Sequence, residues 1–239
     1  MKGIILAGGT GTRLRPLTSI VNKHLLPVGK YPMIHYALVK MAEAGIEQVL
    51  LITGKQSAGL YADYIGDGQP WGLQVRFGIQ EEAGGIAQAL GLAEAFVHPG
   101  EKLLVLLGDN LFEESFRDPV QSFAVSGKGA HVFLKQVEDP RRYGVAEIAA
   151  GLITRVVEKP EQPPSSYAVT GAYLYDSAVF DIIRHLRPSA RGELEITDVN
   201  NAYAAQGLLS YSHLAGWWTD AGTHRSLLEA GARLLEEEE

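Results

Sequence analysis

The sequence predicts an α/β fold, a Rossmann-like three-layer sandwich with a mostly parallel central mixed sheet and a smaller antiparallel-rich lobe. Two observations support this prediction. Short apolar runs alternate with helix-like segments through the first half of the chain, which is typical of βαβ units. The runs 49–52 and 103–107 are continuously apolar rather than alternating, and this favours strands covered on both faces, as in a parallel sheet.

The first half of the chain contributes most of the predicted sheet. Its short apolar runs are the expected strands, and the longer segments between them are the expected helices. The expected strands cover residues 3–7, 48–53, 73–79, 103–108 and 131–137. The expected helices cover residues 33–44, 58–65, 86–96 and 119–126.

The second half changes character, because strands now follow one another with few helices between them. Strands are expected at 145–149, 153–157 and 167–175, and the Pro- and Ser-rich stretch 161–166 is a loop by composition. Two or three helices follow, the last at 223–235. The glutamates at the very end of the chain are expected to be frayed and solvated. No repeat and no linker composition is visible, so we expect one domain over residues 1–239.

Composition excludes several classes of function. The chain has no cysteine, which excludes disulfides and thiolate metal sites, and its formal net charge of −7 argues against a general nucleic-acid binder. Signal-peptide organisation is missing at the N-terminus, which runs directly into a strand-like segment. No apolar run approaches the ~20 residues that span a bilayer. We therefore expect a cytoplasmic protein with no nucleic-acid partner and no membrane partner.

A glycine-rich segment, 6–16, directly follows the first expected strand. It lies in a stretch of 42 residues that holds six Lys or Arg and no Asp or Glu. Glycine lets backbone N–H groups approach an anion closely, and guanidinium groups hold phosphate oxygens. This pattern indicates a site for a polyanion.

Three kinds of phosphate loop compete for this segment. A P-loop requires a Gly-Lys-Ser/Thr sequence that is missing here. A dinucleotide fingerprint requires a third glycine where Leu14 stands, and an acidic residue where 53–55 reads Thr-Gly-Lys. A nucleotidyltransferase loop, in which Arg13 and the downstream Lys23 hold a nucleoside triphosphate, fits. A plain surface turn is the structural alternative, and the acid-free basic context weighs against it.

The chain resembles the sugar-phosphate nucleotidyltransferases over almost its whole length. The resemblance rests first on the glycine segment and on Asn-Lys-His-Leu-Leu-Pro-Val at 22–28. Further matching segments follow in the same order, at 84–89, 107–110, 142–145, 158–160, 167–171, 189–198 and 218–224.

This resemblance implies a reaction and its ligands. The expected substrates are dTTP and glucose 1-phosphate, the products dTDP-glucose and pyrophosphate, and the cofactor Mg²⁺. A sugar-phosphate oxygen would attack the α-phosphorus in line. The second pKa of a phosphate monoester is ~6, so the attacking phosphate is already ionised at neutral pH and no general base is needed. A uridylyltransferase that makes UDP-glucose and a non-catalytic nucleotide-sugar sensor are the alternatives.

The resemblance also assigns residues. Residues about 1–130 would bind the nucleotide, about 131–220 the sugar phosphate, and a C-terminal helix would follow. The expected catalytic residues are Arg13, Lys23 and Lys159, and the expected metal ligands are Asp109 and Asp220. The nucleotide would contact Leu6, Ala7, Gly8, Gly9, Gly11, Thr12, Arg13, Gln80, Gly85 and Asp109. The sugar phosphate would contact Asn110, Tyr143, Gly144, Glu158, Lys159, Val169, Gly171 and Arg191.

Each assignment has a physical rationale and a structural alternative. Asp109 follows an apolar strand, where ligands bind in open α/β sheets, and the Gln80 amide suits thymine or uracil. Alternatively, Gln80 is a polar strand end and Asp220 a turn former. Glu158 would equally suit an ion pair with Lys159, and Arg191 an ion pair with Glu193 or Glu195.

The sequence also departs from the family. His24 stands where long-form relatives often carry Gln, and Gly84 replaces a residue that is more usually bulky or acidic. Long-form relatives continue beyond the last helix with helices that help build a secondary nucleotide site. The resemblance therefore predicts neither the secondary nucleotide site nor the family's tetramer for this chain. A homo-oligomer of another kind stays an open expectation.

Overall fold

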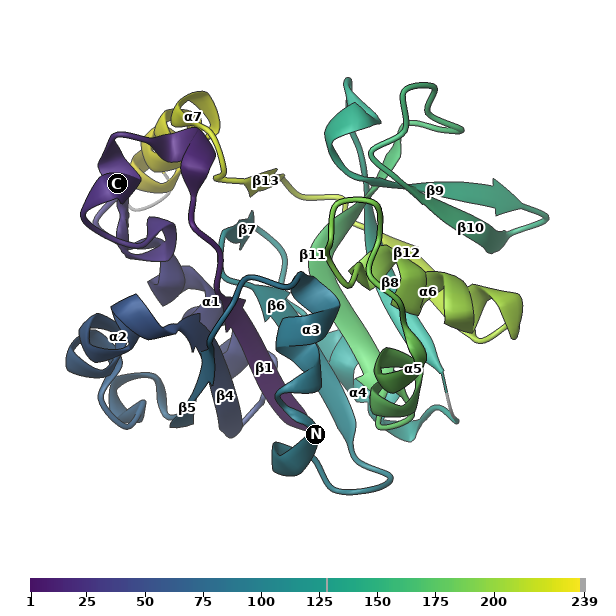
Figure 1. Cartoon of the computed structure of the whole chain (residues 1–239), viewed down its shortest axis with the longest axis horizontal. Coiled ribbons are helices and arrows are strands. Elements are labelled where there is room, and N and C mark those ends of the chain that lie inside the picture. Colours follow the sequence, from purple (N-terminus) through teal and green to yellow (C-terminus); the bar gives the residue numbers. More distant parts are fainter. Residues whose placement is uncertain (128, 237–239) are drawn as a thin grey trace.

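Strand β1 (Lys2–Ala7) lies in the middle of the main sheet and has a parallel neighbour on each side. In the computed structural model, which describes residues 1–127 and 129–236, the main sheet has the order β10-β9-β11-β6-β1-β4-β5. Strand β8 lies beside β11, and β12 lies beside β8. The strands from β6 to β5 are parallel and β11 joins them antiparallel, so the predicted mixed sheet is confirmed (Figure 1).

The elements have the following bounds. The other strands of the main sheet are β4 (Gln48–Gly54), β5 (Gln74–Gln80), β6 (Lys102–Leu107), β8 (Ala130–Gln136), β9 (Gly144–Ala149), β10 (Leu152–Glu158), β11 (Tyr167–Asp176) and β12 (Leu209–His213). Two separate ribbons pair β2 (Pro27–Val28) with β3 (Tyr31–Pro32) and β7 (Asn110–Phe112) with β13 (Trp218–Asp220). The α-helices are α1 (Met33–Glu43), α2 (Ala58–Ile65), α3 (Ile86–Gly91), α4 (Arg117–Val125), α5 (Val179–His185), α6 (Ile196–Ala205) and α7 (His224–Glu236). Short 3₁₀ turns lie at Thr12–Leu14, Leu17–Ser19, Lys23–Leu25, Lys55–Ser57, Gln69–Trp71, Glu94–Phe96 and Pro140–Arg142.

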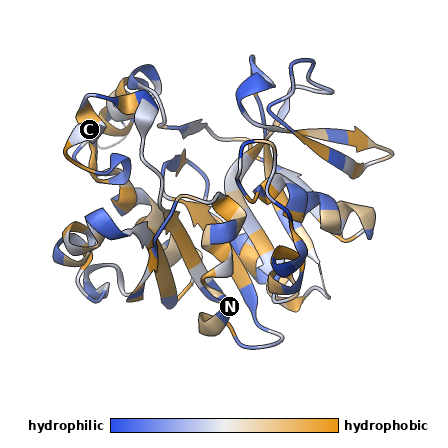
Figure 2. Cartoon of the chain, viewed as in Figure 1, coloured by the Kyte–Doolittle hydropathy of each residue, from blue (hydrophilic) through white to orange (hydrophobic). Residues whose placement is uncertain are grey.

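Helices cover both faces of the sheet, which explains the continuously apolar strands. Successive side chains of a strand point to opposite faces. Ile4 and Leu6 of β1 therefore belong to one core cluster, with α3, α5 and α6, whereas Ile5 and Ala7 belong to the other, with α1, α2 and α4. Figure 2 shows the apolar strands between helices whose outer faces are hydrophilic. A third, smaller cluster lies under α7.

Strands β9 and β10 form an antiparallel hairpin that stands off from the parallel strands (Figure 1). β10 is the last strand in the sheet order, and α6 packs against it. The side-chain amide of Asn201 accepts a hydrogen bond from the Val156 N–H at 2.7 Å and donates one to the Val156 carbonyl at 2.9 Å. One outer N–H and one outer carbonyl of this strand are thus paired with a helix side chain. This hairpin, with the first part of β11, is the predicted antiparallel-rich lobe.

Several boundaries differ from the prediction. The helix expected at 86–96 ends at Gly91 and is followed by the separate 3₁₀ turn at Glu94–Phe96, because a glycine weakens a helix interior by about 1 kcal/mol. Asp220 was expected in a turn, but it ends β13. The ribbons and β12 were not predicted as strands. Of the four glutamates expected to be frayed, Glu236 ends α7, and 237–239 lie outside the described residues. Among the residues described, no helix has the length and apolarity that a membrane crossing requires.

The central position of β1 leads to a stability prediction. Ile5 is fully buried, whereas Ile20 is 94% exposed. Ile5→Ala is expected to lower the free energy of unfolding by about 2–5 kcal/mol, because it leaves a cavity between sheet and helices. Ile20→Ala, the matched control, is expected to change it by less than ~0.5 kcal/mol. Urea denaturation of both variants measures the difference, and equal midpoints would contradict this account of the core.

Candidate active site

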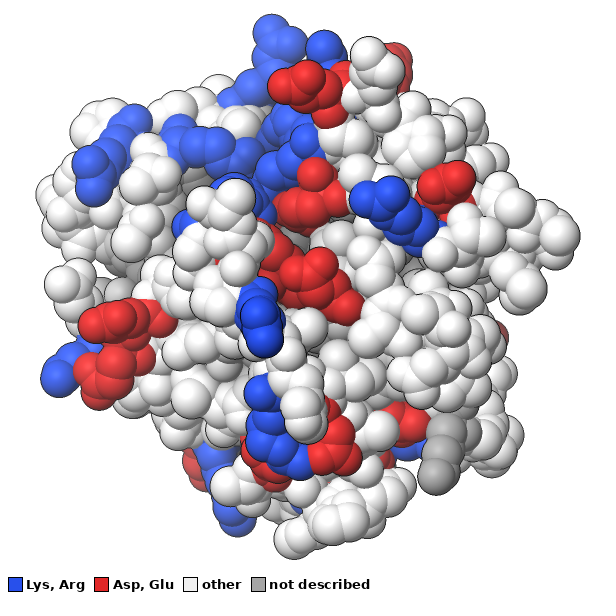
Figure 3. Space-filling model, turned by 45° about the vertical axis from the view of Figure 1, so that its right-hand side comes forward, with Lys and Arg blue, Asp and Glu red and all other residues white. Residues whose placement is uncertain are grey.

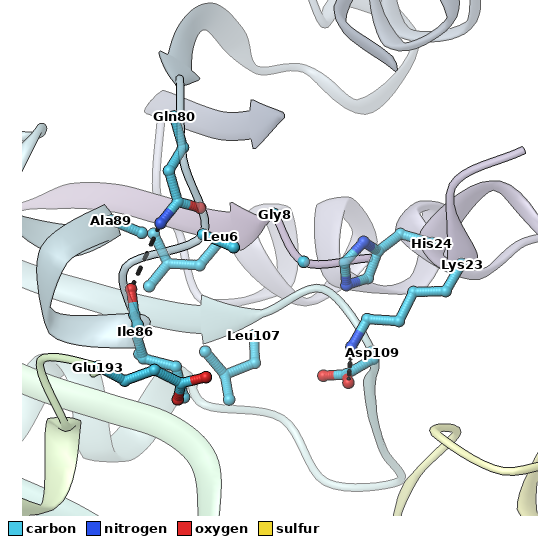
Figure 4. A pocket seen from close by; sticks show the side chains of 13 residues that line it. Leu6, Gly8, Lys23, His24, Gln80, Ile86, Ala89, Leu107, Asp109 and Glu193 are labelled. Carbon is cyan, nitrogen blue, oxygen red and sulfur yellow. Dashed lines mark hydrogen bonds and ion pairs between the residues drawn. The ribbon is translucent and has the colours of Figure 1, made fainter. Parts of the chain in front are cut away.

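The carboxyl ends of the parallel strands bring the predicted site residues to one edge of the sheet. Gly8 directly follows β1, Gln80 ends β5, and Asp109 lies two residues after β6. Because these strands are parallel, their carboxyl ends meet at this edge, where ligands bind in open α/β sheets. Figure 4 shows Gln80 and Asp109 on either side of a pocket, with Gly8 between them.

The pocket has a volume of about 210 Å³. Seven of the predicted nucleotide and catalytic residues line it: Leu6, Gly8, Gly9, Lys23, Gln80, Gly85 and Asp109. The other lining residues are His24, Ala83, Ile86, Ala89, Leu107 and Glu193, and none of them was predicted as a site residue. Leu107 and His24 adjoin predicted residues in the sequence. Glu193, from the loop before α6, lies in the matching segment 189–198 but was considered only as an ion-pair partner of Arg191.

The turn after β1 depends on its glycines. Gly9 and Gly11 have φ angles of 89° and 59°, which favour glycine. Gly11 begins the 3₁₀ turn that carries Thr12 and Arg13, and the Thr18 hydroxyl donates to the Gly11 carbonyl at 2.7 Å. The turn places the Arg13 guanidinium 3.9 Å from the Asp220 carboxylate. Thr12, Gly11 and the buried Ala7 thus support the turn without lining the pocket.

Two further glycines allow close approaches at the pocket wall. A Cβ on Gly8 would lie 2.2 Å from Oε1 of Gln80, so glycine leaves room for this amide. The Gln80 amide donates to Oε1 of Gln88 at 2.6 Å and to the Gly85 carbonyl at 3.4 Å. A Cβ on Gly85, whose φ is 102°, would lie 2.4 Å from the Leu194 carbonyl oxygen. Gly85 therefore lets the pocket wall at Gln80 meet the loop before α6.

Lys23 and Asp109 form an ion pair inside the pocket. The Lys23 ammonium lies 2.5 Å from Oδ2 of Asp109, and the Asn110 amide donates to Oδ1 at 2.9 Å. Burial by itself would raise the pKa of Asp109, but the Lys23 charge and these hydrogen bonds outweigh it and hold the pKa well below its usual range. Asp109 is therefore ionised at neutral pH.

Asp220 lies directly beside Asp109 although more than a hundred residues separate them. The Ala221 N–H donates to the Asp109 carbonyl at 2.9 Å, and Asp220 is the register partner of Asn110. The Tyr143 hydroxyl donates to Asp220 at 3.0 Å. Burial raises the pKa of Asp220, the nearby Arg142 opposes this shift, and the Asp109 charge adds to it.

The two carboxylates fit a hard divalent cation that takes its remaining ligands from phosphate and water, as Mg²⁺ does. Within residues 1–127 and 129–236, no three His, Cys, Asp or Glu side chains cluster so as to hold a metal by themselves. An ion bound here would therefore rely on this pair and on a phosphate substrate.

His24 is a buried, neutral side chain of the pocket. It is 1% exposed, and its Nδ1 lies 2.8 Å from the Asn22 amide oxygen and 3.2 Å from the Tyr61 hydroxyl. Burial, with help from the Lys23 charge, lowers its pKa to about 3. His24 thus links the segment that carries Lys23 to α2.

The predicted sugar-phosphate residues form a second group around Glu158. Its carboxylate lies 3.0 Å from the Lys159 ammonium and accepts a hydrogen bond from Thr197 at 2.6 Å. Arg191 pairs with Glu195 at 2.8 Å and with Glu193 at 3.7 Å, as the structural alternative had it. It also pairs with Glu158 at 3.2 Å, which was not expected. The predicted phosphate roles of Lys159 and Arg191 stay predictions.

The remaining predicted residues connect the two groups. Gly144 is the register partner of Glu158, and the Tyr143 carbonyl accepts from the Lys159 N–H at 2.9 Å. Asn110 accepts from the Gly171 N–H at 2.9 Å and from the Trp218 indole at 2.7 Å. Val169 is buried like Asn110 and Gly171, but it differs from them because its side chain belongs to an apolar core cluster. Figure 3 shows cationic and acidic side chains gathered side by side on this face of the molecule.

Comparisons with known proteins agree on one family. The family model described as "Nucleotidyl transferase" matches residues 2–237. A glucose-1-phosphate thymidylyltransferase of Actinoplanes sp. is 47% identical over 234 residues, which are 96% of this chain and 77% of that protein.

Solved structures give the same result. A crystal structure described as a candidate glucose-1-phosphate thymidylyltransferase from Bacillus anthracis, in complex with a sucrose, is 53% identical with a TM-score of 0.94. The match covers 99% of this chain and 96% of that one. A UDP-glucose pyrophosphorylase complexed with UDP-glucose has a TM-score of 0.86 over 99% of this chain and 98% of its own. At 24% identity, this second likeness concerns the fold alone.

The buried His24 makes stability depend on pH. In the unfolded chain a histidine takes up a proton near pH 6.5, whereas folded His24 stays neutral down to about 3. The stability that neutral His24 contributes is therefore complete above pH 6.5 and is lost as the pH falls towards 3. As the pH falls from 6.5 towards 3, the free energy of unfolding should decrease less steeply in His24→Gln than in wild type. The difference between the two slopes is expected to be up to about 1.4 kcal/mol per pH unit.

Urea denaturation at a series of pH values measures these slopes. His98→Gln, at an exposed position, is the matched control for loss of a histidine. Parallel slopes for wild type and His24→Gln would contradict the buried, neutral assignment.

Proposed function

We propose that this chain, which belongs to the nucleotidyl transferase family, transfers a thymidylyl group from dTTP to glucose 1-phosphate and releases pyrophosphate. One observation carries the proposal: Asp109 and Asp220 lie side by side at the sheet edge, next to Lys23 and the glycine turn. The substrates are those named for the Actinoplanes relative, carried over to this chain.

The pocket suits a pyrimidine base. A glutamine amide can accept from the ring N3–H and donate to a ring carbonyl. Gln80 can therefore pair with thymine or uracil when its amide exchanges the 3.4 Å bond to the Gly85 carbonyl for one to the base. Leu6 and Leu107 supply apolar walls against which a ring can pack. Gly8 leaves room for the Gln80 amide that would pair with the base, because a Cβ there would lie 2.2 Å from Oε1 of Gln80.

The cations of the site suit two polyanionic substrates. Arg13 and Lys23 lie beside the two aspartates and would bind the triphosphate, while Lys159 would hold the sugar phosphate and Glu158 the sugar hydroxyls. Asp109 and Asp220 would hold Mg²⁺, which when bound neutralises phosphate charge as pyrophosphate leaves.

The chemistry requires positioning more than proton transfer. The phosphate of glucose 1-phosphate is largely ionised at neutral pH, because its second pKa is near ~6. One of its oxygens attacks the α-phosphorus of dTTP in line, the new P–O bond forms, and the bond to pyrophosphate breaks. Arg13, Lys23 and Lys159 hold the two anions together and stabilise the charge that develops. The buried neutral His24 holds the Lys23 segment in place.

Removing a charged group from this site should suppress turnover. Arg13→Ala and Asp109→Ala are each expected to lower pyrophosphate release by about 10²–10³, because a charge that stabilises the transition state is lost. Arg117→Ala and Asp63→Ala, at exposed positions on helices away from the pocket, are the matched controls. Near-normal turnover by either site variant would count heavily against the assignment.

A substrate panel tests the choice of nucleotide. Pyrophosphate release is measured with dTTP, UTP, CTP, GTP and ATP against several sugar 1-phosphates. dTTP is expected to be preferred over UTP by only ~1–3 kcal/mol, because the bases differ by one methyl group. A clear preference for UTP would instead indicate a uridylyltransferase. No release with any pair, despite bound nucleotide, would indicate a non-catalytic sensor.

A further inference from the structure

Arg142 contacts the Asp220 carboxylate in an unusual way. It ends the 3₁₀ turn Pro140–Arg142 immediately before Tyr143 and β9. One of its nitrogens, Nη2, lies 3.4 Å from Oδ1 and 3.3 Å from Oδ2 of Asp220. It therefore straddles both oxygens, at distances longer than the ~2.7–2.9 Å typical of charge-assisted hydrogen bonds.

Other groups already fix the orientation of Asp220. The Tyr143 hydroxyl donates to Oδ1 at 3.0 Å, and the Ser226 hydroxyl donates to the Asp220 carbonyl at 2.8 Å. Pairing of β13 with β7 fixes the backbone on either side. The Arg142 guanidinium therefore contributes positive charge beside this carboxylate more than it contributes to the orientation of the carboxylate.

The cations of the two aspartates differ in how easily they could move. Lys23 lies 2.5 Å from Asp109, and its side chain is 17% exposed. Arg142 lies 3.3 Å from Asp220 and its side chain is 41% exposed, while that of Asp220 is 15% exposed. Arg13 is also a cation beside Asp220, but it lies farther away, at 3.9 Å, and contacts one oxygen only. Arg142 is therefore on the accessible side of a largely enclosed carboxylate, where an arriving cation would approach.

We propose that Arg142 is a competing counter-cation for Asp220, which a divalent ion displaces when it binds. This inference rests on the proposed function, in which Asp220 is a metal ligand. The guanidinium and the ion seek the same two oxygens and repel each other, so Arg142 weakens metal binding to the protein alone. The displaced guanidinium stays tethered beside the site, as a positive charge available to the anionic substrates.

An orienting role for Arg142 would have the opposite effect. Partners that orient a metal ligand strengthen metal binding, and their loss typically weakens it about 10–100-fold. Competition predicts that loss of Arg142 strengthens binding. The sign of the change in metal affinity therefore separates the two roles.

The test uses Mn²⁺ as the probe and follows its binding by electron paramagnetic resonance in the absence of nucleotide and sugar phosphate. Arg142→Gln is expected to bind Mn²⁺ about 5-fold more tightly than wild type, a change typical of removing a partly exposed charge contact. Arg141→Gln is the matched control, because Arg141 neighbours Arg142 in the chain but pairs with Asp139, at 2.7 Å. The Mn²⁺ affinity of this variant should equal that of wild type.

Unchanged or weaker Mn²⁺ binding by Arg142→Gln, or no measurable binding by any variant, would overturn the competition. Asp220→Asn separates this failure from that of the proposed function. Loss of binding in Asp220→Asn places the ion at Asp220 and makes the Arg142 result decisive. Wild-type affinity in Asp220→Asn would overturn the metal site itself, and the competition with it.

Discussion

Two neighbouring carboxylates that repel each other are the constraint on which the rest of this site depends. Asp109 and Asp220 are held together by backbone pairing, since the Ala221 N–H bonds to the Asp109 carbonyl at 2.9 Å. Their charges are offset by Lys23 on one side and by Arg13 and Arg142 on the other. The fold thus holds the negative charge of two aspartates at one place and surrounds it with the positive side chains of Lys23, Arg13 and Arg142. The same positive charge is what two anionic substrates require.

Much of the fold followed from local patterns in the sequence. The apolar run at 103–107 has neighbours on both faces, and β6 is buried accordingly. Helix α2 has the bounds expected from its pattern. The three-residue strands β7 and β13 were missed because so short a run has no period of its own, and pairing alone creates them. Helix α3 ends at Gly91, where a glycine weakens the helix. The prediction extended this helix to residue 96 because the apolar pattern continues beyond the glycine.

Part of the candidate site was also predictable from local patterns in the sequence. Arg13 and Lys23 stood out because glycines and cations are close together in the sequence. No spacing could pair Asp109 with Asp220, and there the resemblance to a family supplied what local physics could not. Glu193 enters the pocket only because Gly85 lets the Leu194 backbone come close, which is a contact between distant segments. Arg142 was missed because its partner is a carboxylate on another part of the chain.

The pairing of Asn201 with Val156 has a consequence beyond this site. A strand at the end of a sheet offers unpaired backbone groups to any other extended chain, and stacking of such edges begins fibril growth. In β10 one donor and one acceptor of that free edge are already used by a side chain of α6. A single amide thus interrupts the row of backbone groups that β10 would offer to a neighbouring molecule, which makes intermolecular strand addition at this strand less favourable.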